Sequence, residues 1–131
     1  MRSAREFNWC EWLVLAIAAI TVVSGLVQAI QPGLALGFVG AESTPVSRHF
    51  FGIVGMFMVF FGGALFQGVG SNPPQTAAVF WTGLQKLGAS AAVALGVSRS
   101  IFSGVALLVA GFDLTSGILI ICYWWRIRKA S

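Results

Sequence analysis

Four long apolar stretches fill most of this chain and leave little sequence for anything else. They cover residues 12–30, 50–70, 77–97 and 100–125. Each is close to or above the ~20 residues that a helix needs to cross the hydrocarbon core of a membrane. Charged residues make up only 9% of the chain, against about 25% in an ordinary soluble domain. Because the connections are short, we predict a single all-α transmembrane domain over residues 1–131, an integral membrane four-helix bundle.

The distribution of positive charge predicts the orientation of this bundle. With four spans, both termini lie on the same side of the membrane. Five Lys and Arg residues lie near the termini, whereas the opposite side carries two, Arg48 and Arg99. The positive-inside rule therefore places both termini in the cytoplasm. We attribute the net charge of +4 to this topology and expect no nucleic-acid partner. The basic residues near the termini are Arg2, Arg5, Arg126, Arg128 and Lys129.

The longest connection, residues 31–49, is expected on the outer side of the membrane. Its apolar run, residues 34–39, is far too short to cross, so we expect it to lie in the interface or to dip partly into the bundle. The sequence Ser43-Thr44-Pro45 is typical of a helix start. The following span is rich in Phe and Gly, and glycines allow helices to approach closely.

Two ionisable residues lie in the middle of the last two spans. Lys86 precedes Arg99 by 13 positions, and Asp113 follows it by 14. If a turn at residues 98–100 joins two antiparallel helices, both side chains lie about 20 Å from that turn. A charge at the bilayer centre costs roughly 2.5–3.5 kcal/mol. Three interpretations stay open: a buried ion pair with nitrogen and oxygen within about 4 Å, a midplane site for a substrate, ion or proton, or separate roles for the two residues.

Two further groups of residues surround this predicted pair. Small residues at every fourth position predict a helix–helix seam, and they are Gly88, Ala92 and Gly96. Polar side chains that could support the pair are Gln85, Thr82, Ser90 and Ser116.

His49, at the start of the second span, is the only histidine in the sequence. An imidazole can ligate a metal or relay protons, so His49 and the neighbouring Phe cluster could serve a quinone, haem or pigment. The sequence itself requires no cofactor. It contains no Gly-rich phosphate loop, nucleophile elbow or HExxH motif. We therefore predict no catalytic residue, no metal site and no enzymatic activity.

The layout resembles the small bacterial four-helix membrane proteins grouped as DoxX-like. The shared features are four spans in about 130 residues, a longer first connection, a Gly-rich second span near Arg48-His49, and a basic tail after Tyr123-Trp124-Trp125. This similarity covers the whole chain as architecture, and no site residue is carried over from it. Some members of the group are subunits of quinone-linked redox enzymes. The resemblance implies a multi-pass protein of the bacterial inner (cytoplasmic) membrane.

Together these features predict a non-catalytic accessory subunit that packs against larger membrane partners. An electron-transfer or photosynthetic complex is the expected setting, with membrane lipids and other membrane subunits as partners. The alternative is a small homo-oligomeric transporter or proton-coupled carrier, in which Lys86 and Asp113 form a midplane site.

Overall fold

The computed structural model describes residues 2–3 and 6–130, so Arg5 of the predicted basic group lies outside it. This part of the chain is all helical and contains no strand, which confirms the predicted α class. The helices are α1 (Trp9–Ile30), α2 (Pro32–Phe38), α3 (Pro45–Gly70), α4 (Thr76–Ser98) and α5 (Ala106–Ala130).

Side-chain caps set the starts of α1 and α3. The Asn8 carboxamide accepts a hydrogen bond from the Glu11 backbone N–H at 2.9 Å, and the Glu11 carboxylate accepts one from the Asn8 N–H at 3.3 Å. Thr44 and Ser47 form the same reciprocal cap at the start of α3, where Pro45 follows directly. Proline is favoured there because its missing N–H would have no helical partner anyway. The helix start predicted at Ser43-Thr44-Pro45 is confirmed.

Three helices are long and apolar enough to cross a membrane: α1, α3 and α5. At ~1.5 Å per residue they measure about 33–39 Å, more than the ~30 Å hydrocarbon core. By length and composition the chain is a multi-pass membrane protein. Helix α4 has 23 residues but is not among the three, because Gln85 and Lys86 in its middle lower its mean hydropathy. A crossing by α4 stays a prediction.

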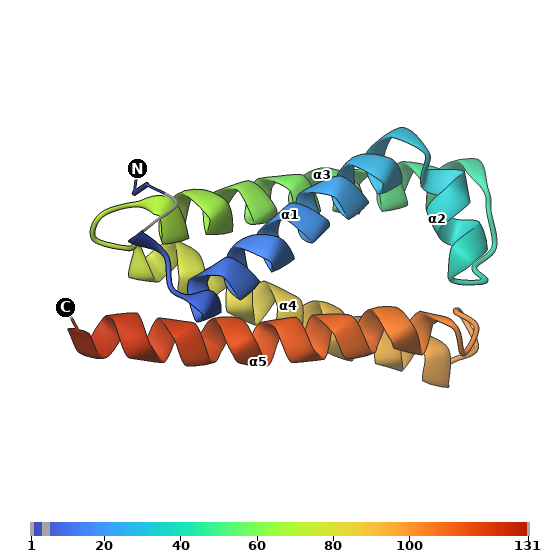
Figure 1. Ribbon diagram of the computed structural model, residues 1–131. Helices are drawn as coiled ribbons and strands as arrows, with labels where there is room; N and C mark the ends of the chain where they lie inside the picture. The colour runs from blue at the N-terminus through green and yellow to red at the C-terminus, as the bar shows by residue number, and fades with distance from the viewer. Residues whose placement is uncertain (1, 4–5, 131) are drawn as a thin grey trace.

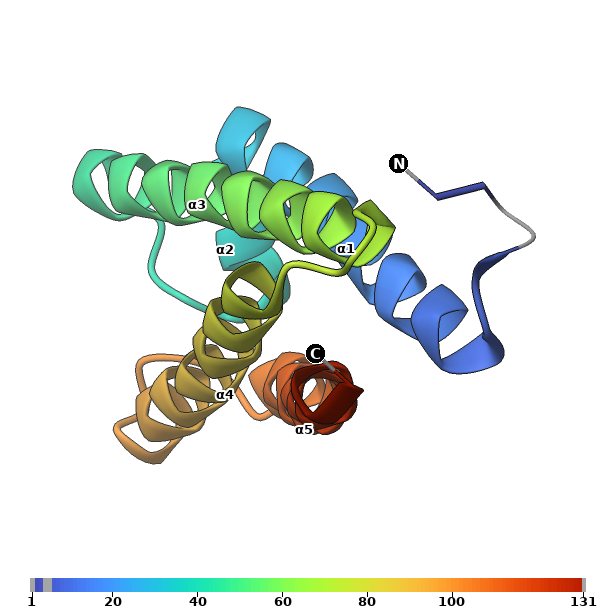
Figure 2. The same cartoon turned by 90° about the vertical axis from the view of Figure 1, so that its left-hand side faces the viewer.

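The long helices form two antiparallel pairs, α1 with α3 and α4 with α5 (Figure 1). In the view of Figure 2, α5 is seen along its axis with α4 beside it, and α3 lies above both. The start of α1 and the end of α5 lie at the same end of the molecule (Figure 1). We call this end the terminal end.

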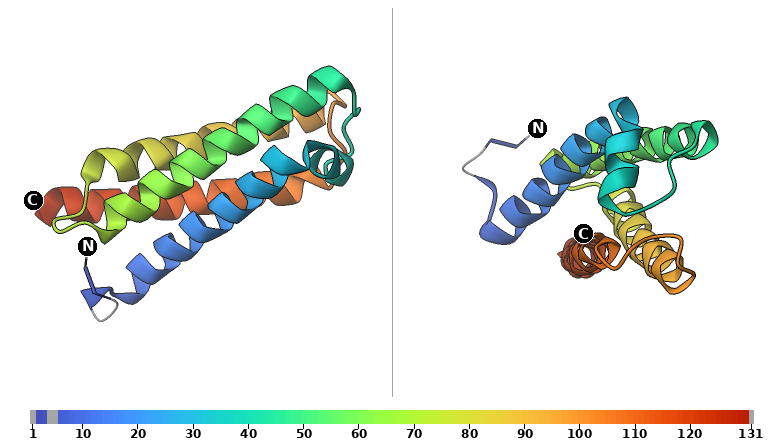
Figure 3. Two further views of the ribbon diagram at one scale, coloured as in Figure 1. Left: turned by 90° about the horizontal axis from the view of Figure 1, so that it is seen from above. Right: turned by 90° about the vertical axis from the view of Figure 1, so that its right-hand side faces the viewer.

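At the opposite end, the short helix α2 lies between the two pairs (Figure 3, right). Its Leu36 is buried. Just after α2, the Val39 carbonyl accepts a hydrogen bond from the Ser103 N–H at 2.8 Å. Gly40 has a φ of 69°, a conformation that glycine adopts readily. The apolar run predicted at residues 34–39 is thus largely helical, and it links the first pair to the α4–α5 connection.

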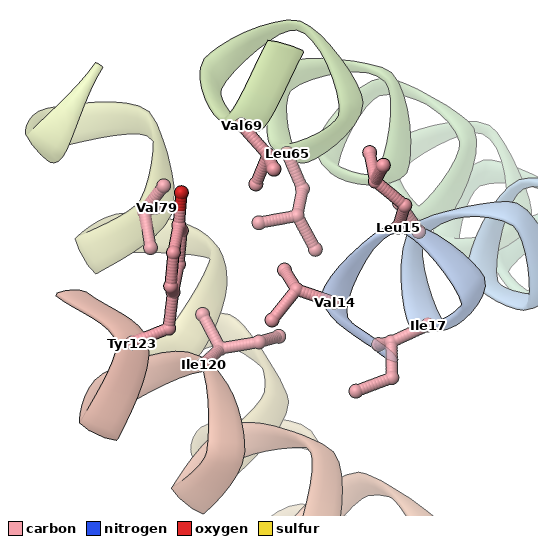
Figure 4. Packing of buried hydrophobic residues seen from close by; sticks show 9 residues of the cluster. Val14, Leu15, Ile17, Leu65, Val69, Val79, Ile120 and Tyr123 are labelled. Carbon is pink, nitrogen blue, oxygen red and sulfur yellow. The ribbon is translucent and has the colours of Figure 1, made fainter. Parts of the chain in front are cut away.

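The apolar core lies near the terminal end, where side chains from all four long helices converge (Figure 4). Val14, Leu65, Val79 and Ile120 are completely buried there. Most other large apolar side chains on these helices point outward, and Phe60, Trp81 and Leu108 are each at least 60% exposed. Such a surface would make a soluble protein prone to aggregation, whereas a membrane solvates it.

Candidate functional site

One face of helix α4 is polar and packs against α5. Thr82, Lys86 and Ser90 recur at every fourth position, so they share one side of the helix, and all three are buried. Two glycines allow the helices to approach on this side. A Cβ at Gly83 would lie 2.6 Å from the Ile121 side chain, and one at Gly117 would lie 2.7 Å from the Leu87 side chain.

The Lys86 and Asp113 side chains face each other across this contact. Lys86 Nζ lies 3.3 Å from Asp113 Oδ1, and the two side chains are only 3% and 12% exposed. This distance meets the 4 Å criterion for an ion pair. The Lys86 ammonium also lies 5.4 Å from the centre of the Phe112 ring, within the range of a cation–π contact. The two charges neutralise each other in a site that water hardly reaches.

The four predicted supporting residues surround the pair in different ways. The Ser90 hydroxyl donates to the Ala110 carbonyl of α5 at 2.8 Å, whereas the Thr82 hydroxyl donates to Ala78 of its own helix. Ser116 is buried one turn after Asp113. The Oε1 atom of Gln85 is buried and has no hydrogen-bond partner among the described residues. Only Ser90 therefore adds a side-chain bond between the two helices.

The connection between α4 and α5 is longer than the turn predicted at residues 98–100. Helix α5 begins at Ala106, six residues later than the predicted span, so that boundary is wrong. The Gly96 carbonyl accepts hydrogen bonds from the N–H groups of Ile101 and Phe102 at 2.9 and 3.3 Å. The connection thus folds back along α4. This return lets Lys86, 12 residues before the end of α4, reach Asp113, seven residues after the start of α5.

The seam predicted from small residues on α4 is wrong within this chain. Gly88 and Ala92 are exposed, and a Cβ at Gly88 would meet nothing within 4 Å. Gly96 is buried, but against the Phe102 ring of the connection rather than a helix. The face of α4 that contacts α5 carries Gly83, Lys86 and Ser90 instead, because the ion pair and the glycine contacts fix the rotation of the helix.

A second polar cluster at the terminal end is not evident from the sequence. The Glu11 carboxylate is buried and forms an ion pair with Arg2. It also accepts a hydrogen bond from the Tyr123 hydroxyl at 2.9 Å. Arg2 donates to the Val69 carbonyl at 2.6 Å, and its hydrogen bond to Glu11 raises the pKa of the guanidinium further. This cluster joins α1, α3 and α5.

Local sequence offers only one signal for this cluster, the Asn8–Glu11 capping spacing. Glu11 is buried although it lies near the start of the chain, because Arg2 and Tyr123 cover it. Tyr123 lies 112 positions away, so no local pattern could pair the two residues.

His49 lies far from both polar clusters in the fold, in the first turns of α3 near the α2 end. It is exposed and makes an edge contact with the Phe50 ring, with centres 6.2 Å apart. Arg48 and Arg99 are also exposed. Among the described residues, no three His, Cys, Asp or Glu side chains gather in a way that could hold a metal ion.

Comparisons with known proteins add no relative to this picture. No family model, curated protein or solved structure matches the chain. The DoxX-like resemblance consequently stays at the level of architecture.

Proposed function

We propose that this protein is a non-catalytic accessory subunit of a membrane complex, with four crossings and both termini in the cytoplasm. The observation that carries the proposal is the closed ion pair. Lys86 and Asp113 lie 3.3 Å apart and are buried, so the charges in the middle of α4 and α5 are used to hold these helices together. Intramembrane ionisable residues are otherwise candidates for binding a substrate or ion.

Outward-facing glycines support a partner subunit. Gly63, Gly88 and Gly111 lie inside long helices, and a Cβ at any of them would meet nothing within 4 Å. Glycine in a helix costs about 1 kcal/mol relative to alanine. A glycine is useful there when another helix packs closely against it. The DoxX-like resemblance would place such a partner in an electron-transfer complex.

Native mass measurement after extraction in a mild detergent tests this proposal. We expect a complex heavier than one copy of the chain. Gly88→Leu should release the partner without unfolding the protein, because the site is open within the chain. Ala94→Leu is the matched control, since Ala94 is exposed on the same helix about 120° away around the axis. A single chain with no bound protein would refute the proposal.

A second candidate is a homo-oligomeric transporter or proton-coupled carrier, and the buried Gln85 Oε1 favours it. This acceptor lacks a partner among the described residues and lies next to Lys86 in sequence. A passing proton donor or cation could satisfy it. In proteoliposomes, Lys86→Ala and Asp113→Asn should then abolish flux while the protein stays folded. If each variant unfolds and the exchange Lys86→Asp with Asp113→Lys restores folding, the pair is structural.

A further inference from the structure

A groove opens on the outer surface of the α1/α3 pair near the terminal end. Its volume is about 380 Å³, and α1 contributes Trp12, Ala16 and Ala19 while α3 contributes Phe66. Apart from Arg2 at one end, the side chains that line it are apolar. Concave, mostly apolar sites with a few polar groups are typical ligand sites. This groove is separate from the Lys86–Asp113 pair.

The groove runs along the membrane normal in the proposed placement. Ala19 lies seven residues after Trp12, so it lies about 10 Å further along α1. Trp12 is 48% exposed and Phe66 is 47% exposed, and these large side chains line the groove together with two small alanines. An extended hydrocarbon chain matches the apolar lining of this groove.

Arg2 supplies the polar group at the membrane-surface end of the groove. Its Nη2 donates to Glu11 and to the Val69 carbonyl, and its guanidinium lies 4.8 Å from the centre of the Phe7 ring. Its Nε atom is buried and has no partner among the described residues. A buried donor without an acceptor is costly. Arginine can present two N–H groups at once to a phosphate.

We propose that this groove binds one phospholipid molecule, with an acyl chain along Ala16 and Ala19 and the phosphodiester at Arg2. The phosphate lies against the Arg2 guanidinium at the membrane-surface end, and the acyl chain covers the apolar walls. The proposal rests on the membrane placement of the protein but not on its role as a subunit.

Native mass spectrometry of the whole protein in detergent micelles, titrated with phosphatidylglycerol, tests this inference. We expect one lipid to stay bound at a stoichiometry of one. Ala19→Phe should weaken binding about tenfold by filling the groove, and Arg2→Lys should do so by removing the second N–H contact. Ala91→Phe is the matched control and should bind like wild type, because Ala91 is exposed on α4 away from the groove.

Three outcomes would overturn the lipid site. They are the absence of a bound lipid, equal binding by wild type and Ala19→Phe, and full displacement by glycerol 3-phosphate, which has no acyl chain. Arg2→Lys keeps the charge beside Glu11, and a thermal melt of each variant separates lost binding from lost folding. A protein that stays in solution without detergent would refute the membrane placement itself, which is a different result from an integrated protein that binds no lipid.

Discussion

The α1/α3 pair is held by backbone contact, whereas the α4/α5 pair is held by side chains that carry charge. A Cβ at Gly55 would lie 2.6 Å from the Gly25 carbonyl oxygen and from the Ala29 nitrogen, so those two helices touch through their main chains. In the second pair, Lys86 and Asp113 span the gap, and Ser90 adds a hydrogen bond. The first pair depends on main-chain atoms that meet at a glycine. In the second pair Gly83 and Gly117 make room for side chains of the facing helix, and the pair depends in addition on two charged side chains being present together.

This difference predicts opposite responses to substitution. Any added carbon at the first contact forces the helices apart. At the second contact, removing one charged side chain lowers the stability of the protein, because the other charge is left buried and unpaired. Removing both side chains together avoids this penalty.

The largest expected effect is the loss of one member of the ion pair. Asp113→Leu leaves the Lys86 ammonium buried without a partner and should reduce the free energy of unfolding by about 3–5 kcal/mol. Unfolding by sodium dodecyl sulfate in mixed micelles measures the change. The double variant Lys86→Met with Asp113→Leu should recover most of it. Equal losses of stability in the single and double variants would contradict the interpretation of Lys86 and Asp113 as a structural ion pair.

A smaller loss is expected at the joint between the two pairs. Tyr123→Phe removes the hydrogen bond to the Glu11 carboxylate, and bonds to charged groups contribute about 1.5–3 kcal/mol. The same detergent titration should report this change. Tyr123→Phe keeps the ring that packs in the buried cluster, so the variant tests the loss of the hydroxyl alone. Wild-type stability in this variant would show that the Tyr123 hydroxyl does not stabilise the joint.

The backbone contact between α1 and α3 gives the next prediction. Gly55→Ala should destabilise the protein by about 1–3 kcal/mol, the usual cost of overpacking, because the atoms it meets are main-chain atoms that cannot move aside. Gly52→Ala on the same helix serves as the control, because its Cβ would lie 3.6 Å from the nearest atom, the Ala29 carbonyl oxygen, which is an ordinary contact. It should raise stability by up to about 1 kcal/mol through helix propensity. Similar results for the two variants would refute the close contact.

The smallest expected effect lies in the hydrogen bond beside the ion pair. Ser90→Ala removes the bond to the Ala110 carbonyl and should cost about 0.5–1.5 kcal/mol. Thr82→Val is the matched control, because the Thr82 hydroxyl bonds only within its own helix. A larger loss of stability in Thr82→Val than in Ser90→Ala would contradict the role of the Ser90 hydrogen bond in joining α4 to α5.

Much of the fold follows from the apolar runs, because each long run became one helix. A matching depth for Lys86 and Asp113 was also predicted from the sequence, which left open whether the two side chains face each other, and the turn was placed too early. Lys86 and Asp113 lie at the same depth because the connection folds back over Gly96. This return of the chain cannot be predicted from the number of residues between them. The seam at Gly88 and Ala92 failed for a related reason. Small residues show where a helix can be approached but not which neighbour approaches it.

Lys86 and Asp113 lie 27 positions apart, and this spacing has a consequence for biosynthesis. In the proposed placement with four crossings, the ribosome completes α4 before it makes Asp113, so a lone α4 would enter the bilayer with an uncompensated ammonium in its middle. That step is unfavourable, and α4 is also the long helix that is not apolar enough to cross alone. We therefore expect the insertion machinery to hold α4 until α5 arrives and to release the two into the lipid as one hairpin.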